Sequence, residues 1–139
     1  MVDLAVQPGL KGTAHLKVGV EHTAPSIGSG KVGVLATPVM INLIEAAALA
    51  AVEHLLPAGH QSLGIHLDVR HFAATPIGMN VTATAELTAV EGRTLSFQVE
   101  AHDDKEPIGG GTHQRVVVNV ARFDERVQRK LRGCQRPEV

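Results

Sequence analysis

The longest apolar stretch of the sequence, residues 35–56, predicts one central helix. Thr37 followed by Pro38 predicts its start, because a threonine hydroxyl at the N-cap can accept a hydrogen bond from a first-turn amide and proline is tolerated at the first helical position. Pro57 and Gly59 predict its end. Since the stretch is apolar on almost every side, we expect the helix to be buried nearly all round.

The rest of the chain alternates between apolar and polar residues over several segments, which is the pattern of strands with one buried face. Segments of this kind span 14–20, 62–71, 79–90, 93–102 and 108–120, and residues 31–35 are a candidate for a further short strand. Glu91 and Gly92 predict a tight hairpin turn, and the Gly, Ser and Pro content of 22–30 predicts a loop. A short polar helix is expected over 122–132.

These elements predict an α+β fold in which an antiparallel sheet of about five strands wraps around one long central helix. Strands follow one another without helices between them, which excludes a doubly wound parallel fold. A chain of 139 residues is long enough for a sizeable core, so we expect a single domain over 1–139. Residues from about 126 to 139 are expected to form its polar helix or tail.

Two of the strands carry unusual residues. In 62–71, parity places four aliphatic residues on one face, namely Leu63, Ile65, Leu67 and Val69. His71 follows on this apolar face, where another valine or leucine would be usual. Residues 109–111 are three consecutive glycines inside a strand, which predicts a bulge or the close approach of another backbone or a ligand.

Charge and composition narrow the functional class. The formal net charge is −1, acids and bases are interspersed, and three Phe are the only aromatic residues besides histidine, so a nucleic-acid partner is not expected. The basic residues near the C-terminus are interpreted as a solvated helix end. A single cysteine, Cys134, and no N-terminal signal pattern predict a cytoplasmic protein. The apolar helix is long enough to cross a bilayer, but Glu45 and the strand-rich remainder predict a core helix and no membrane partner.

Metal and nucleotide chemistry find little support. Eight histidines are present, but none has the HxxxH spacing, no CxxC pair exists, and parity places His66 and His71 on opposite faces of their strand. We therefore expect no metal site. P-loop and GxSxG motifs are missing, which argues against nucleoside triphosphate and serine-hydrolase functions.

Three residues stand out as candidates for chemistry. Glu45 lies in the middle of an apolar helix, where a carboxylate must be paired, exposed to a cleft or neutralised; its structural alternative is a carboxylate that reaches solvent or a neighbouring subunit. Thr37 lies at the helix start, where free amides can hold a carbonyl oxygen or oxyanion. The two residues are about 12 Å apart along the helix, at a rise of about 1.5 Å per residue, so they cannot bond directly. A sheet histidine such as His71 could bridge them, or the parts could combine across a dimer interface.

Four segments carry a family resemblance. They are ATPVMINLIE (36–45), SLGIHLDVRHFAATPIG (62–78), VTATAELTAVEGRTLSFQVEAHD (81–103) and IGGGTHQRVVVN (108–119). Together they resemble the fluoroacetyl-CoA thioesterase family of hotdog-fold proteins. The resemblance implies an acyl-CoA thioesterase that acts as a homodimer, with a tetramer as the alternative, and that needs no cofactor because CoA is part of the substrate.

The resemblance also implies a set of site residues. The catalytic threonine, glutamate and histidine of the family fall on Thr37, Glu45 and His71, the residues already singled out. The substrate-contacting glycine and arginine of the family fall on Gly64 and Arg115. Arg115 has two interpretations, as a partner for a CoA phosphate or as half of a structural ion pair.

One departure from the family bears on the substrate. The fluoroacetyl-specific enzyme carries phenylalanines just before the helix, which close over the acyl group, whereas this chain has IGSGKVGVLA there. The resemblance therefore implies a short or medium acyl thioester rather than fluoroacetyl specificity. Glu45 is either nucleophile or general base, and His71 orients, deprotonates or protonates the leaving thiolate. The second hypothesis is a non-catalytic protein that binds acyl-CoA or a hydrophobic ligand. A hydratase or dehydratase is a third, but its Asp and His pair is not found.

Overall fold

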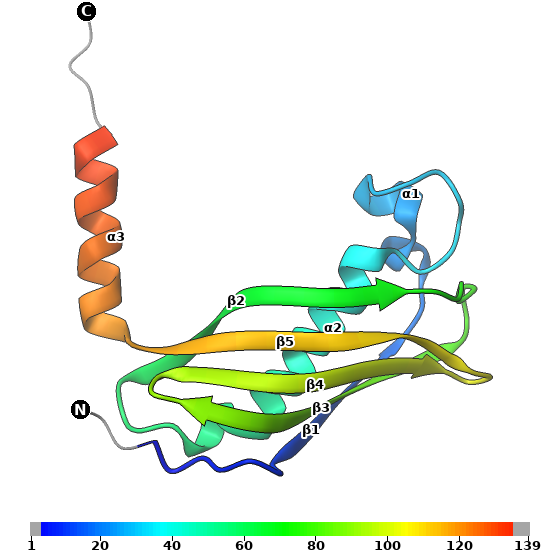
Figure 1. Ribbon diagram of the computed structural model, residues 1–139. Coiled ribbons are helices and arrows are strands. Elements are labelled where there is room, and N and C mark those ends of the chain that lie inside the picture. Colours follow the sequence, from blue (N-terminus) through cyan, green and yellow to red (C-terminus); the bar gives the residue numbers. More distant parts are fainter. Residues whose placement is uncertain (1–3, 135–139) are drawn as a thin grey trace, which may run out of the picture.

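A five-stranded antiparallel sheet and one central helix form the body of the molecule (Figure 1). The computed structural model describes residues 4–134. The strands are β1 (Lys11–Lys17), β2 (His60–His71), β3 (Asn80–Glu91), β4 (Thr94–Asp103) and β5 (Pro107–Asn119), in the spatial order β1-β3-β4-β5-β2. The helices are α1 (Ala24–Ile27), α2 (Thr37–Val52) and α3 (Val120–Cys134). The predicted α+β architecture is confirmed.

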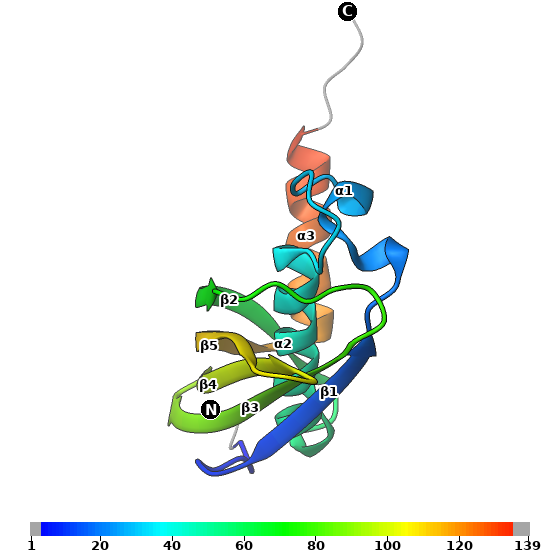
Figure 2. The same ribbon diagram turned by 90° about the vertical axis from the view of Figure 1, so that its right-hand side faces the viewer.

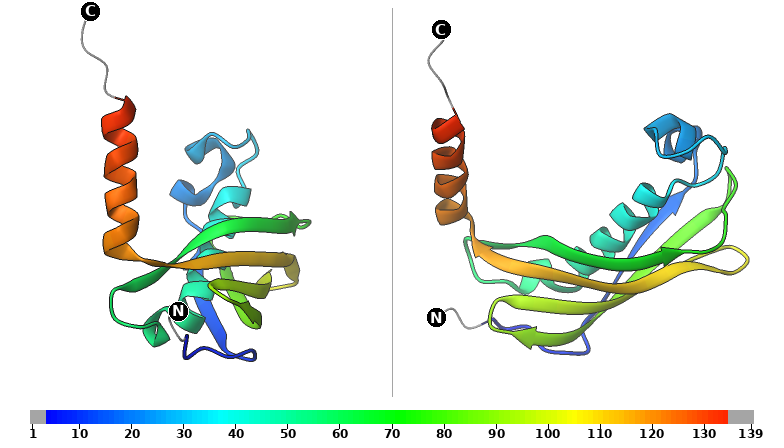
Figure 3. Two further views of the ribbon diagram at one scale, coloured as in Figure 1. Left: turned by 60° about the vertical axis from the view of Figure 1, so that its left-hand side comes forward. Right: turned by 45° about the horizontal axis from the view of Figure 1, so that its top comes forward.

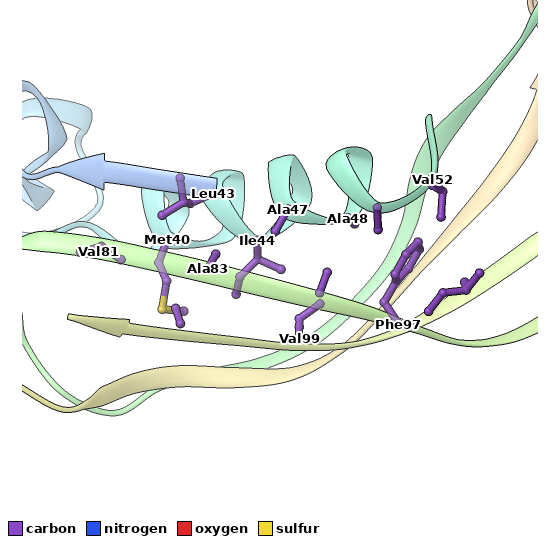
Figure 4. Packing of buried hydrophobic residues seen from close by; sticks show 14 of the residues in the cluster. Met40, Leu43, Ile44, Ala47, Ala48, Val52, Val81, Ala83, Phe97 and Val99 are labelled. Carbon is purple, nitrogen blue, oxygen red and sulfur yellow. The ribbon is translucent and has the colours of Figure 1, made fainter. Parts of the chain in front are cut away.

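Helix α2 packs one face against the concave side of the sheet. Its buried residues are Met40, Leu43, Ile44, Ala47, Ala48, Ala51 and Val52, and they meet side chains such as Phe97 and Val99 of β4 (Figure 4). The expectation of burial nearly all round is wrong for the single chain, because Pro38, Asn42 and Ala50 are exposed on the opposite face. The stretch Thr37–Leu55 has the length and composition of a membrane span, yet its packing here is that of a core helix.

Strand β1 lies against α2 at very short range (Figure 2). A Cβ atom added at Gly12 would lie 2.2 Å from the carbonyl oxygen of Ala47 and 2.4 Å from the amide nitrogen of Ala51. Glycine on the strand and alanines on the helix therefore let the two backbones approach directly. This contact fixes the position of α2 across the sheet.

The start of α2 differs by one residue from the prediction. Ala36 is the N-cap, with φ −72° and ψ 140°, and Thr37 is already the first helical residue. The Ala36 carbonyl accepts hydrogen bonds from the amides of Val39 and Met40, while its own amide donates to the carbonyl of His22. The hydroxyl of Thr37 makes no capping bond and is available for another partner.

Strand β2 is an edge strand, and its two faces differ from the simple parity prediction. A β-bulge at Ile65 shifts the register with β5, so that Gly64 pairs with Arg115 but His66 pairs with Gln114. The extra residue reverses the alternation. Leu63 consequently lies on the outer face, whereas Leu67, Val69 and His71 lie on the α2 face, and the predicted single aliphatic face is wrong.

The N-terminal third departs from the prediction in three places. Residues 31–35 do not form a strand, because only an isolated bridge joins Leu35 to Thr23. The predicted loop 22–30 contains the one-turn helix α1, and β1 begins and ends three residues earlier than the predicted 14–20. The loop carries Gly28 with φ +80°, a left-handed conformation that ends α1.

Helix α3 leaves the sheet after β5 and stands away from its end, opposite the end that carries α1 (Figure 3). It has no buried residue. It confirms the polar helix predicted over 122–132, and extends it at both ends. The remainder of the predicted tail, residues 135–139, lies outside the described residues.

Candidate active site

The start of α2 and the end of β2 meet at Thr37 and His71. Oγ1 of Thr37 and Nδ1 of His71 share a hydrogen bond of 2.7 Å. Both residues line a cleft of about 310 Å³, whose other walls come from the segment between α1 and α2 and from the residues after β2. Val32, Val34, Leu35 and Phe72 supply its large apolar side chains. A hydroxyl and an imidazole thus lie together beside a small, partly apolar space.

His71 is neutral at neutral pH in this position. Burial lowers the pKa of His71 below its usual value, and the nearby backbone of Ala73 offsets only part of the effect. Its second ring nitrogen, Nε2, is buried and has no hydrogen-bond partner among the described residues. Because a buried polar atom is normally satisfied, Nε2 is suited to a group from outside this chain.

The tautomer of His71 decides its chemistry. If Nδ1 accepts the hydroxyl proton of Thr37, the threonine oxygen becomes more nucleophilic and Nε2 carries a hydrogen that can be donated. If Nδ1–H instead donates to Oγ1, Nε2 keeps a lone pair that can take a proton from a water. Both arrangements fit the 2.7 Å contact.

Glu45 lies two turns further along α2 and forms a second group with Arg115. Nη1 of Arg115 donates to Oε2 of Glu45 over 3.1 Å. The other guanidinium nitrogens are held by Ser62, with Nε donating to its Oγ at 2.8 Å and Nη2 to its carbonyl at 3.1 Å. The guanidinium is almost fully buried, while 35% of the Glu45 side chain is exposed. Glu45 is therefore a paired carboxylate with one open side.

Glu53, the other acidic residue of the apolar stretch, holds Ser62, the residue that binds the Arg115 guanidinium. Its Oε1 accepts the hydroxyl proton of Ser62 at 2.7 Å, and its Oε2 accepts the Ser62 amide at 3.0 Å. Ser62 in turn accepts from Arg115. A continuous chain of charge-assisted hydrogen bonds thus runs from Glu53 to Glu45 and fixes the arginine between them.

Gly64 lies directly against the carboxylate of Glu45. A Cβ atom at this position would be 2.5 Å from Oε2 of Glu45 and 3.2 Å from Cε1 of His113. The absence of a side chain on β2 therefore leaves the space that the carboxylate occupies. This is a steric reason for glycine, since no positive φ accompanies it.

The structure brings the five predicted site residues together in two groups rather than one. Thr37 and His71 form the first, and Glu45, Gly64 and Arg115 form the second. No hydrogen bond joins His71 to Glu45 among the described residues, so the predicted bridge reaches only Thr37. The catalytic roles of these residues stay predictions.

The family model for fluoroacetyl-CoA-specific thioesterases matches residues 18–121. The chain belongs to this family. A curated relative, the fluoroacetyl-CoA thioesterase of Streptantibioticus cattleyicolor, is 47% identical over 97 residues, which is 70% of each chain. These findings confirm the predicted family and the prediction of a thioester hydrolase.

Solved structures agree with the family assignment. The fluoroacetyl-CoA thioesterase FlK matches with a TM-score of 0.85 and 38% identity, covering 91% of this chain and 98% of FlK. A hot-dog-like protein from Thermanaerovibrio acidaminovorans matches with a TM-score of 0.80 and 26% identity, covering 88% and 91%. The predicted hotdog fold is thereby confirmed. Variants of FlK have been crystallised with fluoroacetate and CoA, and with acetyl-CoA.

His113 is a residue of this thioesterase site that the sequence did not single out. It is fully buried, its Nδ1 lies 2.8 Å from the carbonyl oxygen of His66, and its Nε2 lies 3.1 Å from Nη1 of Arg115. A carbonyl only accepts and a guanidinium only donates, so Nδ1 carries the hydrogen and His113 is neutral. Burial is the main cause of the lowered pKa of His113, and the positive charge of Arg115 lowers this pKa as well. The only available signal was its place in the GTHQR string.

Arg115 has the contacts of the structural ion pair rather than those of an open phosphate site. Its donors are shared among Glu45, Ser62 and His113, and its side chain is only 6% exposed. Four of its five N–H donors are therefore engaged by protein groups. These contacts favour the structural ion pair among the two interpretations of Arg115.

Proposed function

We propose that this chain hydrolyses acyl-CoA thioesters with a short or medium acyl group, using Thr37, Glu45 and His71. The observation that carries the proposal is the 2.7 Å contact between the Thr37 hydroxyl and His71, whose pKa is lowered. A neutral imidazole bonded to a hydroxyl beside a small cleft is suited to proton transfer at a carbonyl. Family membership and the CoA and acetyl-CoA complexes of FlK variants support this substrate class.

The acyl group fits the cleft of about 310 Å³ at the start of α2. The thioester carbonyl would lie against the first turn of α2, where the amide and the hydroxyl of Thr37 can stabilise the developing oxyanion. Phe72 lines this cleft and is 63% exposed, and it is the only aromatic side chain besides His71 among the residues that line it. Phe72 follows β2, whereas the lid phenylalanines implied by the family resemblance precede the central helix. The aromatic side chain of this cleft therefore comes from a different segment.

Two routes to hydrolysis fit Glu45. In the first, a carboxylate oxygen bonds to the carbonyl carbon as the C–S bond breaks, the CoA thiolate takes up a proton, and water then cleaves the mixed anhydride to regenerate Glu45. In the second, Glu45 removes a proton from a water that attacks the carbonyl directly, and that proton passes to the thiolate. His71 supplies or accepts a proton in either route, and no cofactor is needed.

A homodimer would join the two groups of site residues. Strand β2 is a twelve-residue edge strand whose exposed apolar residues include Leu63 and Ile65, 37% and 54% exposed. Such an edge is a template for pairing with another strand. In a twofold pair of antiparallel β2 strands, the His71 end of one strand runs alongside the Gly64 half of the other. We expect this dimer, or a tetramer built from it, in the cytoplasm.

The test is hydrolysis of a panel of acyl-CoAs from acetyl to octanoyl by the wild type and by Glu45→Gln, His71→Ala and Thr37→Ala. We expect turnover of the shorter members and a fall in kcat of about 10² or more in the first two variants. Lys130→Gln, on the exposed helix α3, is the control and should match the wild type. Turnover that is unchanged in Glu45→Gln and His71→Ala would refute the catalytic assignment. Acyl-CoA binding without any turnover would favour the non-catalytic binding protein instead.

A further inference from the structure

A large cleft lies between α3 and the end of the sheet, away from the Thr37 and His71 pair. Its volume is about 980 Å³. The residues that line it are His60, Gly92, Arg93, Asn119, Arg122, Glu125, Arg126 and Arg129. Four of these are arginines, and Glu125 is the only acid among them, in the part of the chain that the structure describes. The cleft is therefore strongly positive although the whole chain has a formal net charge of −1.

The arginines approach the cleft from two walls. Arg122, Arg126 and Arg129 follow an i, i+4, i+7 spacing, which places them on one face of α3. Arg93 comes from the turn between β3 and β4 and forms the facing wall. None of the three helical arginines forms an ion pair with a described residue. Guanidinium groups that form no ion pair and lie on opposite walls are suited to a ligand with several negative charges, phosphate above all.

The position of the cleft relative to Glu45 narrows the choice of ligand. Asn119 lies four residues beyond Arg115 on β5, and their cross-strand partners on β2 are His60 and Gly64. An even spacing keeps these residues on the same face of the sheet, roughly 13 Å apart at about 3.3 Å per residue. The cleft is thus on the α2 face, roughly 13 Å from the residues that hold Glu45.

This separation matches the geometry of CoA. The pantetheine arm between the thioester sulphur and the diphosphate is about as long as four residues of extended chain, roughly 14 Å. A thioester carbonyl near Glu45 would therefore carry its phosphates to the cleft. Arg115, the arginine nearest to Glu45, is already occupied by protein partners.

We infer that the α3 cleft binds the diphosphate and 3′-phosphate groups of CoA, through Arg93 on one wall and Arg122, Arg126 and Arg129 on the other. This assignment rests on the proposed function, because it takes the thioester to lie at Glu45. The protomer that supplies Glu45 also supplies the phosphate site. Helix α3, which has no buried residue of its own, thereby acquires a role in substrate binding.

The test compares two double variants of α3 that remove the same charge. Arg122→Gln/Arg129→Gln changes the cleft, whereas Lys130→Gln/Arg132→Gln changes the same helix at residues that do not line it. We expect the first to raise the KM for acyl-CoA about tenfold with kcat nearly unchanged. It should leave the KM for the acyl-pantetheine thioester, which lacks the phosphates, unaltered. The second should match the wild type with both substrates.

A third variant tests whether the effect comes from misfolding of α3. A binding measurement tests whether the cleft prefers the phosphates of CoA to other anions. Arg93→Gln lies on the facing wall and should raise the same KM without altering α3. Titration calorimetry should show that adenosine 3′,5′-bisphosphate binds the wild type and binds the cleft variants more weakly. Equal binding of inorganic phosphate would overturn the assignment to CoA.

The outcomes separate this site from the proposed activity. An unchanged KM for acyl-CoA in the cleft variants, or an equal change with acyl-pantetheine, would overturn the phosphate site while hydrolysis itself stands. If no acyl-CoA is hydrolysed but CoA binds and the cleft variants weaken that binding, the activity fails and the phosphate site stands.

Discussion

Thr37 and His71, 34 residues apart in the sequence, share a 2.7 Å hydrogen bond that joins the first turn of α2 to the last residue of β2. Neither residue bonds to Glu45, which lies two helical turns after Thr37 and is held by Arg115. The helix therefore carries two halves of a site. The first half holds a histidine with a lowered pKa and the second an ion-paired carboxylate, so each half is tested by a different experiment.

The pH dependence of activity should report on His71. Burial lowers its pKa below the ordinary 6.5, and a base acts only in its neutral form. We therefore expect kcat/KM to rise with pH through a pKa below 6.5 and to be flat above it, and the His71→Gln variant to lose this rise. A pH–rate profile from pH 4.5 to 8.5 measures it. An ascending limb centred above pH 6.5 would contradict the role of a desolvated histidine.

Replacement of Gly64 by alanine should damage the Glu45 half of the site without unfolding the protein. The new Cβ would lie 2.5 Å from Oε2 of Glu45, the far end of a flexible side chain, so the carboxylate moves rather than the backbone. A displacement of about 1 Å can cost about a hundredfold in rate, and we expect a fall in kcat of that order. Gly133→Ala, where no atom lies within 4 Å, is the control. Unchanged kcat in Gly64→Ala would show that Glu45 is not held at the reacting centre.

Much of the fold could be predicted because its signals are local. Alternation marked β3 and β4, the glycine after Glu91 marked their hairpin, and the apolar stretch marked α2. The bulge at Ile65 could not be predicted, because an inserted residue leaves the alternation of the sequence looking intact while it moves Leu63 to the other face. The shift of the helix start to Thr37 was equally hidden, because tertiary bonds of Ala36 decide it.

The individual candidate residues of the site could be predicted from the sequence, but their division into two groups could not. Thr37, Glu45 and His71 were conspicuous because each is polar in an apolar or structured context. Their separation into two groups depends on which partner the glutamate finds, and Arg115 comes from a strand 70 residues later. The positive cleft beside α3 was missed for a similar reason, since the basic residues there appear as a solvated helix end until Arg93 faces them.

Arg115 should contribute to stability as well as to the site. Its buried guanidinium donates to Glu45 and twice to Ser62, so Arg115→Gln leaves these acceptors poorly satisfied. Glu45 is 35% exposed, which reduces the loss below that of a fully buried pair. We expect the free energy of unfolding to fall by about 2 kcal/mol in urea titrations. Arg132→Gln, at an exposed position on α3, should change it by less than about 0.5 kcal/mol.

The contact between β1 and α2 should tolerate no added methyl group. A Cβ atom at Gly12 would overlap the backbone of Ala47 and Ala51, and backbone cannot move aside as a side chain can. We expect Gly12→Ala to lower the free energy of unfolding by about 3 kcal/mol, at the upper end of the cost of overpacking. Gly33→Ala, at a position with open space, is the matched control. Equal urea midpoints for the two variants would contradict the close approach of strand and helix.

Phe72 should determine the length of acyl group that the cleft accepts. It lines the same cleft as Thr37 and His71, beside Val32 and Val34, and its side chain is the largest in that wall. Truncation to alanine enlarges the cleft, so we expect Phe72→Ala to shift the ratio of kcat/KM for hexanoyl-CoA over acetyl-CoA by roughly tenfold in favour of the longer group. Ile77→Ala, which removes a similarly exposed apolar side chain outside the cleft, should leave the ratio unchanged. If both variants keep the wild-type ratio, the acyl group lies somewhere other than the cleft at the start of α2.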